Sequence, residues 1–249
     1  MKIISIYNHK GGVGKTTATK FLASYLESKQ KKVLLIDMDP QSNLSKAFIN
    51  EYNPYLKNNL NIYDVLMNDE SINSCKHDVS DYIHIVPSSD KHNDTNNEML
   101  VSSVLKNPST RLKNKLIDLD YDYVIIDCAP TKDLLATASL TASDEVLVPL
   151  SMDKYAIDGI RGVVSKVEEV KREFNSSLKI SGIFLNAGKT SKTYTELHEH
   201  LLQELPTLVL SNKVNNYMQV NVDTFNSTIT DSEAKEQFYK VFEEVKYGI

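Results

Sequence analysis

The sequence predicts an α/β fold, built on a doubly wound, mostly parallel sheet flanked by helices. Short apolar runs rich in β-branched residues alternate with helical patterns along the 249 residues. Several of these runs are apolar at almost every position, which is typical of strands covered on both faces. The sequence has no internal repeat, heptad pattern, low-complexity tail or linker, and so we expect a single domain over residues 1–249.

The expected strands are runs of Ile, Val, Leu and Tyr bounded by turn-forming residues. In chain order they are Lys2–Tyr7, Lys32–Ile36, Tyr82–Val86, Tyr121–Ile126, Glu145–Leu150 and Lys179–Leu185, with Thr207–Leu210 as a further candidate. The polar segments Glu51–Asn61 and Ser88–Asn97 are expected to be surface loops.

The expected helices carry apolar residues at three- and four-residue spacing. They are Lys15–Ser28, Leu134–Thr141, Asp158–Phe174, Thr193–Glu204 and Ser232–Val245. In the last helix, one apolar stripe is predicted to belong to the core rather than to contact a cofactor. The stripe consists of Phe238, Val241, Phe242 and Val245.

The charge balance shows that the chain is not basic overall. The 28 basic and 33 acidic residues give a formal net charge of −5, so any nucleic-acid surface must be a local patch. The arginines are Arg111, Arg161 and Arg172, and bidentate arginine readout of guanine is therefore scarce. Lysine–phosphate contacts with little sequence preference would dominate any binding to DNA.

Several cellular settings are disfavoured by the composition. No apolar run approaches the roughly 18 residues that a membrane span needs, and the N-terminal segment turns polar too early for a signal peptide. Cys75 and Cys128 form neither a disulfide framework nor a CxxC metal motif. We therefore expect a cytoplasmic protein.

A glycine-rich motif joins the first expected strand to the first expected helix. It reads Lys10-Gly11-Gly12-Val13-Gly14-Lys15-Thr16-Thr17. This context is that of a P-loop, whose backbone N–H groups and helix N-terminus bind phosphate oxygens. Lys15 is expected to reach the β- and γ-phosphates, and the Thr16 hydroxyl to bind Mg²⁺. The alternative is a glycine-rich turn that binds nothing.

Carboxylates follow two of the expected strands. Asp37 and Asp39 come directly after Lys32–Ile36, and the period of two puts both side chains on one side. Ligands of such sheets bind outside the carboxyl ends of the strands. The pair suits Mg²⁺ contacts and the positioning of water, with a helix cap as the alternative. Strand Tyr121–Ile126 runs into Asp127, a Walker B pattern in which Asp127 would hold Mg²⁺ directly or through water.

The motif KGGxGK[ST] resembles the deviant Walker A of the ParA/MinD family of ATPases. It carries Lys10 beside His9, where the standard P-loop has its first glycine. The string Asp37-Met38-Asp39-Pro40-Gln41 resembles the second motif of this family, and Asp127-Cys128-Ala129-Pro130 stands where the family often has DxPP. The resemblance runs from Lys10 to Asn186 and implies one ParA-like P-loop ATPase domain of the deviant Walker A type.

The resemblance also implies roles for individual residues. Lys10 would reach across a dimer interface to the nucleotide of the partner, and Asp39 would orient or activate the attacking water. Asn186, at the end of an expected strand, would contact adenine. The implied catalytic residues are Lys10, Lys15 and Asp39, and the implied metal-binding residues are Thr16, Asp39 and Asp127; the loop from Lys10 to Thr17 and Asn186 would bind the nucleotide.

Within the family, the chain resembles the short Soj-like partition ATPases without a DNA-binding extension. The resemblance implies that ATP closes a homodimer, which binds double-stranded DNA non-specifically and associates with the nucleoid. A ParB-like centromere-binding protein would stimulate hydrolysis to ADP and release the dimer, with Mg²⁺ as the metal. Seven basic and three acidic residues between Gly159 and Lys192 offer a local patch for DNA.

Other functions of the same superfamily remain alternatives. A MinD-like membrane-associated positioning ATPase would need a basic amphipathic C-terminal helix, whereas Glu233–Ile249 holds three lysines and four glutamates. An iron–sulfur reductase would need cluster cysteines. A tyrosine kinase usually carries a C-terminal tyrosine cluster, and here Tyr239 and Tyr247 stand apart. Asp39 argues against a nucleotide-sensing scaffold without activity. We therefore expect partition rather than membrane binding.

Overall fold

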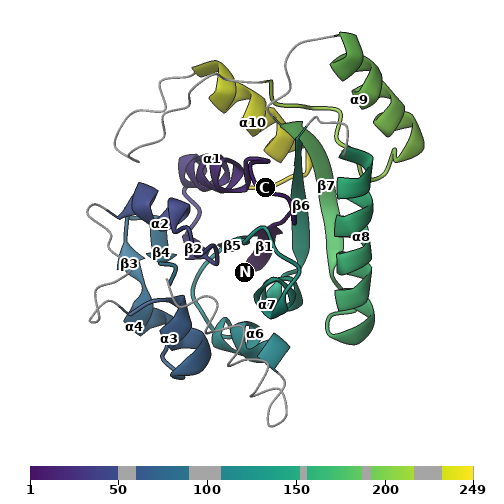
Figure 1. Cartoon of the computed structure of the whole chain (residues 1–249). Coiled ribbons are helices and arrows are strands. Elements are labelled where there is room, and N and C mark those ends of the chain that lie inside the picture. The colour runs from purple at the N-terminus through teal and green to yellow at the C-terminus, as the bar shows by residue number, and fades with distance from the viewer. Residues whose placement is uncertain (50–59, 90–107, 152–155, 187–191, 216–231, 249) are drawn as a thin grey trace.

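A seven-stranded sheet forms the centre of the molecule (Figure 1). The computed structural model describes the chain apart from residues 50–59, 90–107, 152–155, 187–191, 216–231 and 249. The strand order is β3-β4-β2-β5-β1-β6-β7. Neighbouring strands are parallel except for the antiparallel pair β3 and β4. The predicted doubly wound, mostly parallel α/β fold is confirmed.

Six of the strands correspond to runs predicted from the sequence, with bounds that differ by one or two residues. The strands are β1 (Lys2–Ile6), β2 (Val33–Asp37), β3 (His77–Asp78), β4 (Ile83–Val86), β5 (Tyr123–Asp127), β6 (Glu145–Ser151) and β7 (Lys179–Asn186). The two-residue strand β3 is too short to show a period.

The prediction of a strand over Thr207–Leu210 is wrong. Only an isolated parallel bridge forms there, between Val209 and Ile183 of β7. The N–H groups of Leu208 and Val209 both donate to the carbonyl of Leu205, at 3.0 and 2.9 Å. Alternate residues of this segment donate to β7, as Leu210 does to Ile183, and the turn diverts the N–H of Leu208 that a longer ladder would need.

Helices cover both faces of the sheet (Figure 1). Their bounds are α1 (Lys15–Ser28), α2 (Asn43–Phe48), α3 (Ile62–Met67), α4 (Ile72–Cys75), η1 (Pro108–Thr110), α6 (Arg111–Lys115), α7 (Leu134–Ala142), α8 (Ala156–Glu173), α9 (Lys192–Glu204) and α10 (Ser232–Glu244). The five predicted helices are present. The others are short and have no amphipathic period. The predicted loops lie almost entirely outside the described residues.

Two hydrophobic cores flank the sheet, and alternate residues of each strand divide between them. In β1, Ile4 and Ile6 belong to the core beneath α1, α2 and α10. Ile3, together with Tyr7 just after the strand, belongs to the other core, beneath α3, α6, α7 and α8. This division follows from the period of two along a strand. Apolar side chains therefore fill both faces of the sheet, and a ligand has to bind at the ends of the strands.

The C-terminal helix α10 packs against α1, the helix that follows the glycine-rich loop. The rings of Phe21 and Phe238 stack with centroids 4.3 Å apart. Phe238, Val241 and Phe242 are buried, and Val245 is partly buried against the same core, which confirms the predicted stripe. The apolar face of α10 is thus already occupied. Among the described helices, none combines the length and apolarity that a bilayer crossing requires.

Candidate nucleotide-binding site

The site lies at the carboxyl ends of the central strands, where the loop between β1 and α1 passes over the sheet. β1 lies between β5 on one side and β6 on the other, so the strand order reverses there. In doubly wound sheets, such a reversal opens a crevice in which ligands bind. The structure brings together, at this edge, the loop from Lys10 to Thr17 and the ends of β2, β5 and β7.

Glycine is required at two positions of the loop. Gly12 and Gly14 have φ values of 74° and 87°, in the region that residues with a Cβ rarely adopt. Gly14 is also the N-cap of α1. A Cβ added to it would lie 2.0 Å from Nδ2 of Asn186. The absence of a side chain at Gly14 therefore makes room for the side chain of Asn186 against the start of α1.

Asn186 ties the last strand of the sheet to the glycine-rich loop. Its Nδ2 donates to the carbonyl of Val13 at 2.8 Å, and its side chain is buried. Sequence reasoning placed Asn186 at the adenine and missed this contact with the loop backbone. The contact joins residues 173 positions apart. No local pattern in the sequence could have indicated it.

Lys15 points into the loop rather than into solvent. Only 6% of the residue is exposed, and Nζ donates to the carbonyl of Lys10 at 3.1 Å. Burial lowers the pKa of Lys15, whereas the nearby Asp127, Cys128 and Asp39 act in the opposite direction. The ammonium group is thus positioned inside the curve of the loop, where a P-loop lysine binds phosphate.

Lys10 is held at its backbone and lies against α8. Its N–H donates to Oδ1 of Asn8 at 3.0 Å, and Nδ2 of Asn8 donates to the carbonyl of Pro149 in β6 at 2.9 Å. A Cβ on Gly159 of α8 would lie 3.5 Å from Cε of Lys10. In the described structure, the position at which the Lys10 side chain leaves the loop is thus fixed. That Lys10 reaches the nucleotide of a partner subunit stays a prediction.

Thr16 and Asp127 are in direct contact. Oγ1 of Thr16 donates to Oδ2 of Asp127 at 2.7 Å. Asp127 is fully buried, and its Oδ1 has no hydrogen-bond partner among the described residues. Burial raises the pKa of Asp127 to about 8, with a further contribution from Asp37, while Thr16 and Lys15 oppose the shift. A buried carboxylate oxygen without a partner calls for a cation or water.

These two side chains fit a magnesium ion. A hydroxyl and a carboxylate are hard oxygen donors, and Mg²⁺ is usually held by one or two protein oxygens together with phosphates and waters. No group of three or more His, Cys, Asp or Glu that could hold a metal occurs within the described ranges. The donor set at Thr16 and Asp127 is thus one that a phosphate-bound Mg²⁺ can complete.

Asp37 has a structural role. Its Oδ2 accepts from the N–H and the hydroxyl of Ser45, at 2.8 and 2.6 Å, and its Oδ1 accepts from the N–H of Asp39 at 3.1 Å. Burial raises the pKa of Asp37 to about 6, and the hydrogen bonds from Ser45 oppose the shift. Ser45 lies in the first turn of α2. The capping alternative considered for this carboxylate is therefore the one observed.

Asp39 lies two residues after Asp37, the last residue of β2. Its Oδ1 accepts from the N–H of Gln41 at 2.9 Å, and its carbonyl accepts from the hydroxyl of Ser88. It is buried, and it is close enough to influence the pKa of both Lys15 and Asp127. The structure therefore places Asp39 beside the loop lysine, and its action on water stays a prediction.

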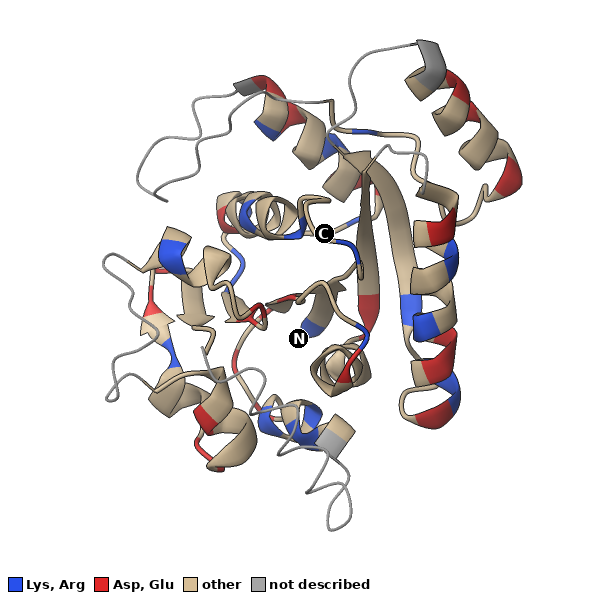
Figure 2. Ribbon diagram, viewed as in Figure 1, with Lys and Arg blue, Asp and Glu red and all other residues tan. Residues whose placement is uncertain are grey.

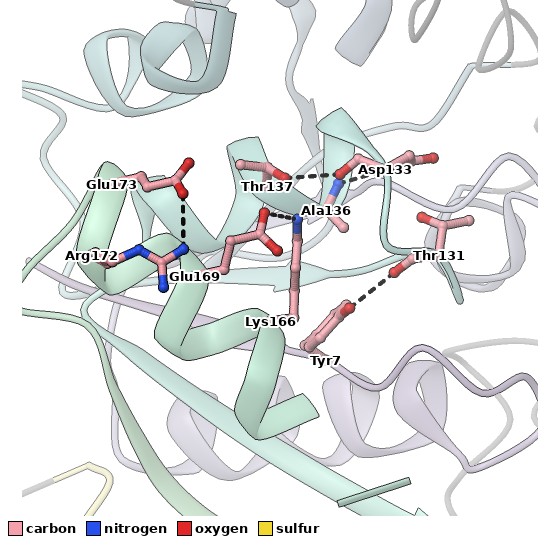
Figure 3. Close-up of polar contacts among 9 residues, drawn as sticks. All are labelled: Tyr7, Thr131, Asp133, Ala136, Thr137, Lys166, Glu169, Arg172 and Glu173. Atoms are coloured by element: carbon pink, nitrogen blue, oxygen red, sulfur yellow. Dashed lines mark hydrogen bonds and ion pairs between the residues drawn. The ribbon is translucent and has the colours of Figure 1, made fainter. Parts of the chain in front are cut away.

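The segment after β5 is anchored to β1 and α7 (Figure 3). The hydroxyl of Tyr7 donates to the carbonyl of Thr131 at 3.0 Å, and Asp133 caps α7 by accepting from the N–H of Ala136 at 3.1 Å. On the facing side, Lys166 of α8 is paired with Glu169 at 2.7 Å. The backbone after Asp127 is thereby attached to Tyr7, at the end of β1, and to the start of α7.

Basic and acidic residues are interspersed along α8 (Figure 2), and the basic ones pair with acids of the same helix. Arg161, Lys166, Lys171 and Arg172 form ion pairs with Asp158, Glu169, Glu168 and Glu173, respectively. Lys166 is also buried. The excess charge predicted for Gly159–Lys192 is therefore not a bare patch on this helix. Lys189 and the side chain of Lys192 lie outside the described residues.

Comparison with known proteins gives a consistent family. The family model described as "AAA domain" (AAA_31) matches residues 1–180. The chromosome partitioning protein ParA of Myxococcus xanthus is 36% identical over 189 residues, which are 74% of this chain and 64% of that protein. The sporulation initiation inhibitor protein Soj of Bacillus subtilis is 35% identical over 193 residues, which are 74% of this chain and 72% of that protein.

Solved structures share the fold over nearly the whole chain. A plasmid partition protein of Borrelia burgdorferi bound to AMPPNP has a TM-score of 0.80 at 26% identity, covering 98% of this chain and 97% of that chain. Cobyrinic acid a,c-diamide synthase of Mycobacterium smegmatis, with bound ADP and magnesium, has a TM-score of 0.82 at 22% identity, covering 100% and 97%. The second likeness shows the fold alone. From the family model and the identities to ParA and Soj, we conclude that the chain belongs to the ParA/Soj family of P-loop ATPases.

Proposed function

We propose that this protein is a Mg²⁺-dependent ATPase that drives the partition of a plasmid or chromosome, converting ATP and water to ADP and phosphate. The observation that carries the proposal is the grouping of Lys15, Thr16 and Asp127 at one end of the sheet. The buried Lys15 amine lies inside the loop, and Thr16 contacts Asp127 at 2.7 Å. The relatives named as partitioning proteins support the same assignment.

Nucleotide binding is assigned to the loop from Lys10 to Thr17. The N–H groups at the start of α1 and the Lys15 ammonium bind the phosphates. Asn186 supports the loop from β7 and, as the family resemblance implies, also contacts the adenine. Thr16 and Asp127 would hold Mg²⁺, with Asp39 nearby. When bound, the ion neutralises charge on the phosphate oxygens.

Hydrolysis would proceed by positioning and charge stabilisation. Asp39 orients a water molecule, whose oxygen forms a bond to the γ-phosphorus as the bond between that phosphorus and the β–γ bridging oxygen breaks. The proton of the water passes to the released phosphate or to solvent. Lys15, and Lys10 from the partner subunit, stabilise the negative charge that develops on the phosphate oxygens.

The cycle would act through partners. ATP closes two copies of the chain into a homodimer, in which each Lys10 reaches the nucleotide of the other copy. The dimer binds double-stranded DNA without sequence preference and so associates with the nucleoid in the cytoplasm. A ParB-like centromere-binding protein stimulates hydrolysis, and the dimer then dissociates from the DNA. Slow turnover without this partner suits a switch whose ATP state must persist.

The decisive experiment measures binding to a random-sequence DNA duplex at fixed moderate salt. The wild type is tested without nucleotide, with ADP and with ATP, and the Lys10→Ala variant is tested with ATP. We expect the wild type to bind the duplex only when ATP is present. We expect Lys10→Ala not to bind the duplex in the presence of ATP. Raising the salt should weaken binding steeply, because lysine–phosphate contacts release counterions.

Further outcomes separate the parts of the proposal. Normal ATP turnover by Lys15→Ala would contradict the phosphate-loop assignment, and wild-type turnover by Asp39→Ala would show that another group positions the water. ATP hydrolysis without DNA binding in any nucleotide state would move the assignment to another positioning ATPase. Binding to liposomes of anionic lipid, measured by flotation, would then identify the membrane-associated type.

A further inference from the structure

The residue that replaces the first glycine of the phosphate loop packs against α8. In the standard pattern GxxxxGK[ST], position 9 would be a glycine, and here it is His9. A bulky ring beside a loop that must approach phosphates needs space elsewhere in the fold. The space comes from Gly162, in the middle of α8.

The contact between His9 and Gly162 leaves no room for a side chain at position 162. A Cβ added to Gly162 would lie 2.4, 3.0 and 3.2 Å from Cε1, Nε2 and Nδ1 of the His9 ring. Glycine in the interior of a helix lowers its stability relative to alanine. The presence of glycine at this helical position is therefore explained by the imidazole packed against it.

Gly159 lies three residues earlier on α8 and provides a natural comparison. A Cβ added there would lie 3.5 Å from Cε of Lys10 and 3.6 Å from Cδ1 of Leu150, which are ordinary van der Waals distances. An alanine therefore fits at position 159 but not at position 162. The two glycines share a helix and both face the loop, yet only Gly162 requires the absence of a side chain.

Packing, rather than hydrogen bonding, fixes the imidazole. Nδ1 of His9 is buried and has no hydrogen-bond partner in the described part of the chain. Burial lowers the pKa of His9, and the positive charges of Lys132, Lys10 and Lys15 lower it further. Burial and these positive charges therefore favour the uncharged form of the imidazole.

The neighbours of His9 in the chain are fixed as well. The side chain of Asn8 bridges the carbonyl of Pro149 and the N–H of Lys10, at 2.9 and 3.0 Å. The backbone before and after His9 is thereby attached to β6. With the ring seated on α8, the point at which the Lys10 side chain leaves the loop is determined by two independent attachments.

We propose that His9 is a positioning residue, whose imidazole seated on Gly162 sets the direction of Lys10 for hydrolysis. This inference rests on the proposed function, because it assumes that Lys10 acts on a bound nucleotide. His9 acts through Lys10, and it takes no part in the chemistry. Nucleotide affinity depends on the phosphate-binding groups of the loop from Gly12 to Thr17, whereas the ring of His9 packs against Gly162 of α8.

The test compares Gly162→Ala with the matched control Gly159→Ala in the full chain. ATP affinity is measured with a fluorescent ATP analogue, kcat and KM by phosphate release, and ATP-dependent dimerisation by light scattering. We expect Gly162→Ala to keep the affinity for the analogue within about threefold and to lose about tenfold to a hundredfold in kcat, because small misplacements of a charged group are costly. Gly159→Ala should stay within about twofold of the wild type, because its Cβ makes ordinary contacts.

The variant His9→Ala and the double variant His9→Ala/Gly162→Ala complete the experiment. If both glycine and histidine act through one contact, the double variant should lose no more kcat than His9→Ala alone. Additive losses, or wild-type kcat in either single variant, would overturn the proposal. His9→Ala also decides the matter if Gly162→Ala does not fold, as judged by circular dichroism. Absence of ATP binding and hydrolysis in the wild type would instead overturn the proposed function.

Discussion

Asp37 and Asp127 end neighbouring strands and are paired in register, yet their surroundings differ. Both are fully buried. Asp37 accepts three hydrogen bonds, two of which hold the first turn of α2, whereas Asp127 accepts one from Thr16 and keeps an oxygen without a partner in the described structure. Position at a strand end therefore does not make a carboxylate functional. The two carboxylates differ in whether their hydrogen bonds leave an oxygen available to a ligand.

The largest expected effect is that of Asp127→Asn on hydrolysis. The amide removes a negative charge that would face Mg²⁺, and turnover should fall at least about a hundredfold. Above pH 8, where Asp127 is charged in the nucleotide-free protein, stability should be unchanged or higher, because a buried charge with incomplete hydrogen bonding is replaced by a neutral group. Phosphate release and thermal unfolding measure the two effects. Turnover near that of the wild type would show that Asp127 is not the ligand.

The substitution Asp37→Asn should have the opposite profile. An amide has one acceptor oxygen, so it cannot accept from Ser45 and from the N–H of Asp39 together, and the free energy of unfolding should fall by about 2 kcal/mol. Turnover by the folded variant should fall far less than in Asp127→Asn. Urea unfolding measures the loss, and Ser45→Ala serves as the matched variant. Equal losses of turnover in the two aspartate variants would remove the distinction between them.

The pH dependence of stability should report the same two carboxylates. Burial raises the pKa of Asp127 to about 8 and that of Asp37 to about 6, from an ordinary 3.8. Between these values and 3.8, the folded state keeps protons that the unfolded state has released. The free energy of unfolding should therefore fall as the pH rises from 4 to 8, by up to about 1.4 kcal/mol per pH unit for each proton.

Urea unfolding of the nucleotide-free protein at pH 5, 6, 7 and 8 tests this slope. Asp127→Asn should flatten the curve between pH 6 and pH 8 and reduce its slope by about half below pH 6, where Asp37 alone then contributes. A slope that persists unchanged above pH 6 in this variant would assign the titration to other groups.

The smallest effect is expected for Asn186→Ala. The variant loses one hydrogen bond to the carbonyl of Val13, worth about 1 kcal/mol. If the whole of this free energy is lost from nucleotide binding, affinity for a fluorescent ATP analogue should fall about fivefold. Retention of wild-type affinity would show that Asn186 stabilises the fold and does not support nucleotide binding. Titration at fixed Mg²⁺ measures the difference.

The sequence was sufficient for the elements that carry a period or a dense motif. Buried parallel strands are apolar at nearly every position, so six strands could be predicted within one or two residues. The helices α1, α7, α8, α9 and α10 have amphipathic or apolar patterns long enough to recognise. The shorter α3 depends instead on a capping box at Asn61 and Asp64, which is a local hydrogen-bond arrangement with little periodic signal.

The candidate site was predictable only where its residues are close in sequence. The loop from Lys10 to Thr17 forms one continuous motif, and Asp127 follows a strand of the expected kind. The hydrogen bonds of Asp37 to Ser45, the contact of Asn186 with Val13 and the seat of His9 on Gly162 depend on tertiary packing. A single sequence contains no pattern for such contacts, and so the roles of Asn186 and His9 were not predicted in this form.

The contact between Asn186 and the phosphate loop also orders events during synthesis of the chain. All the motif residues up to Thr17 leave the ribosome early, but the side chain that covers Gly14 and binds Val13 comes 173 residues after Val13. At about 5 to 20 residues per second, the loop waits roughly 10 to 35 s for this support. During that interval a nascent chain carries a complete phosphate-binding sequence without its completed site. Such a chain would reach its full affinity for ATP only after β7 has joined the sheet.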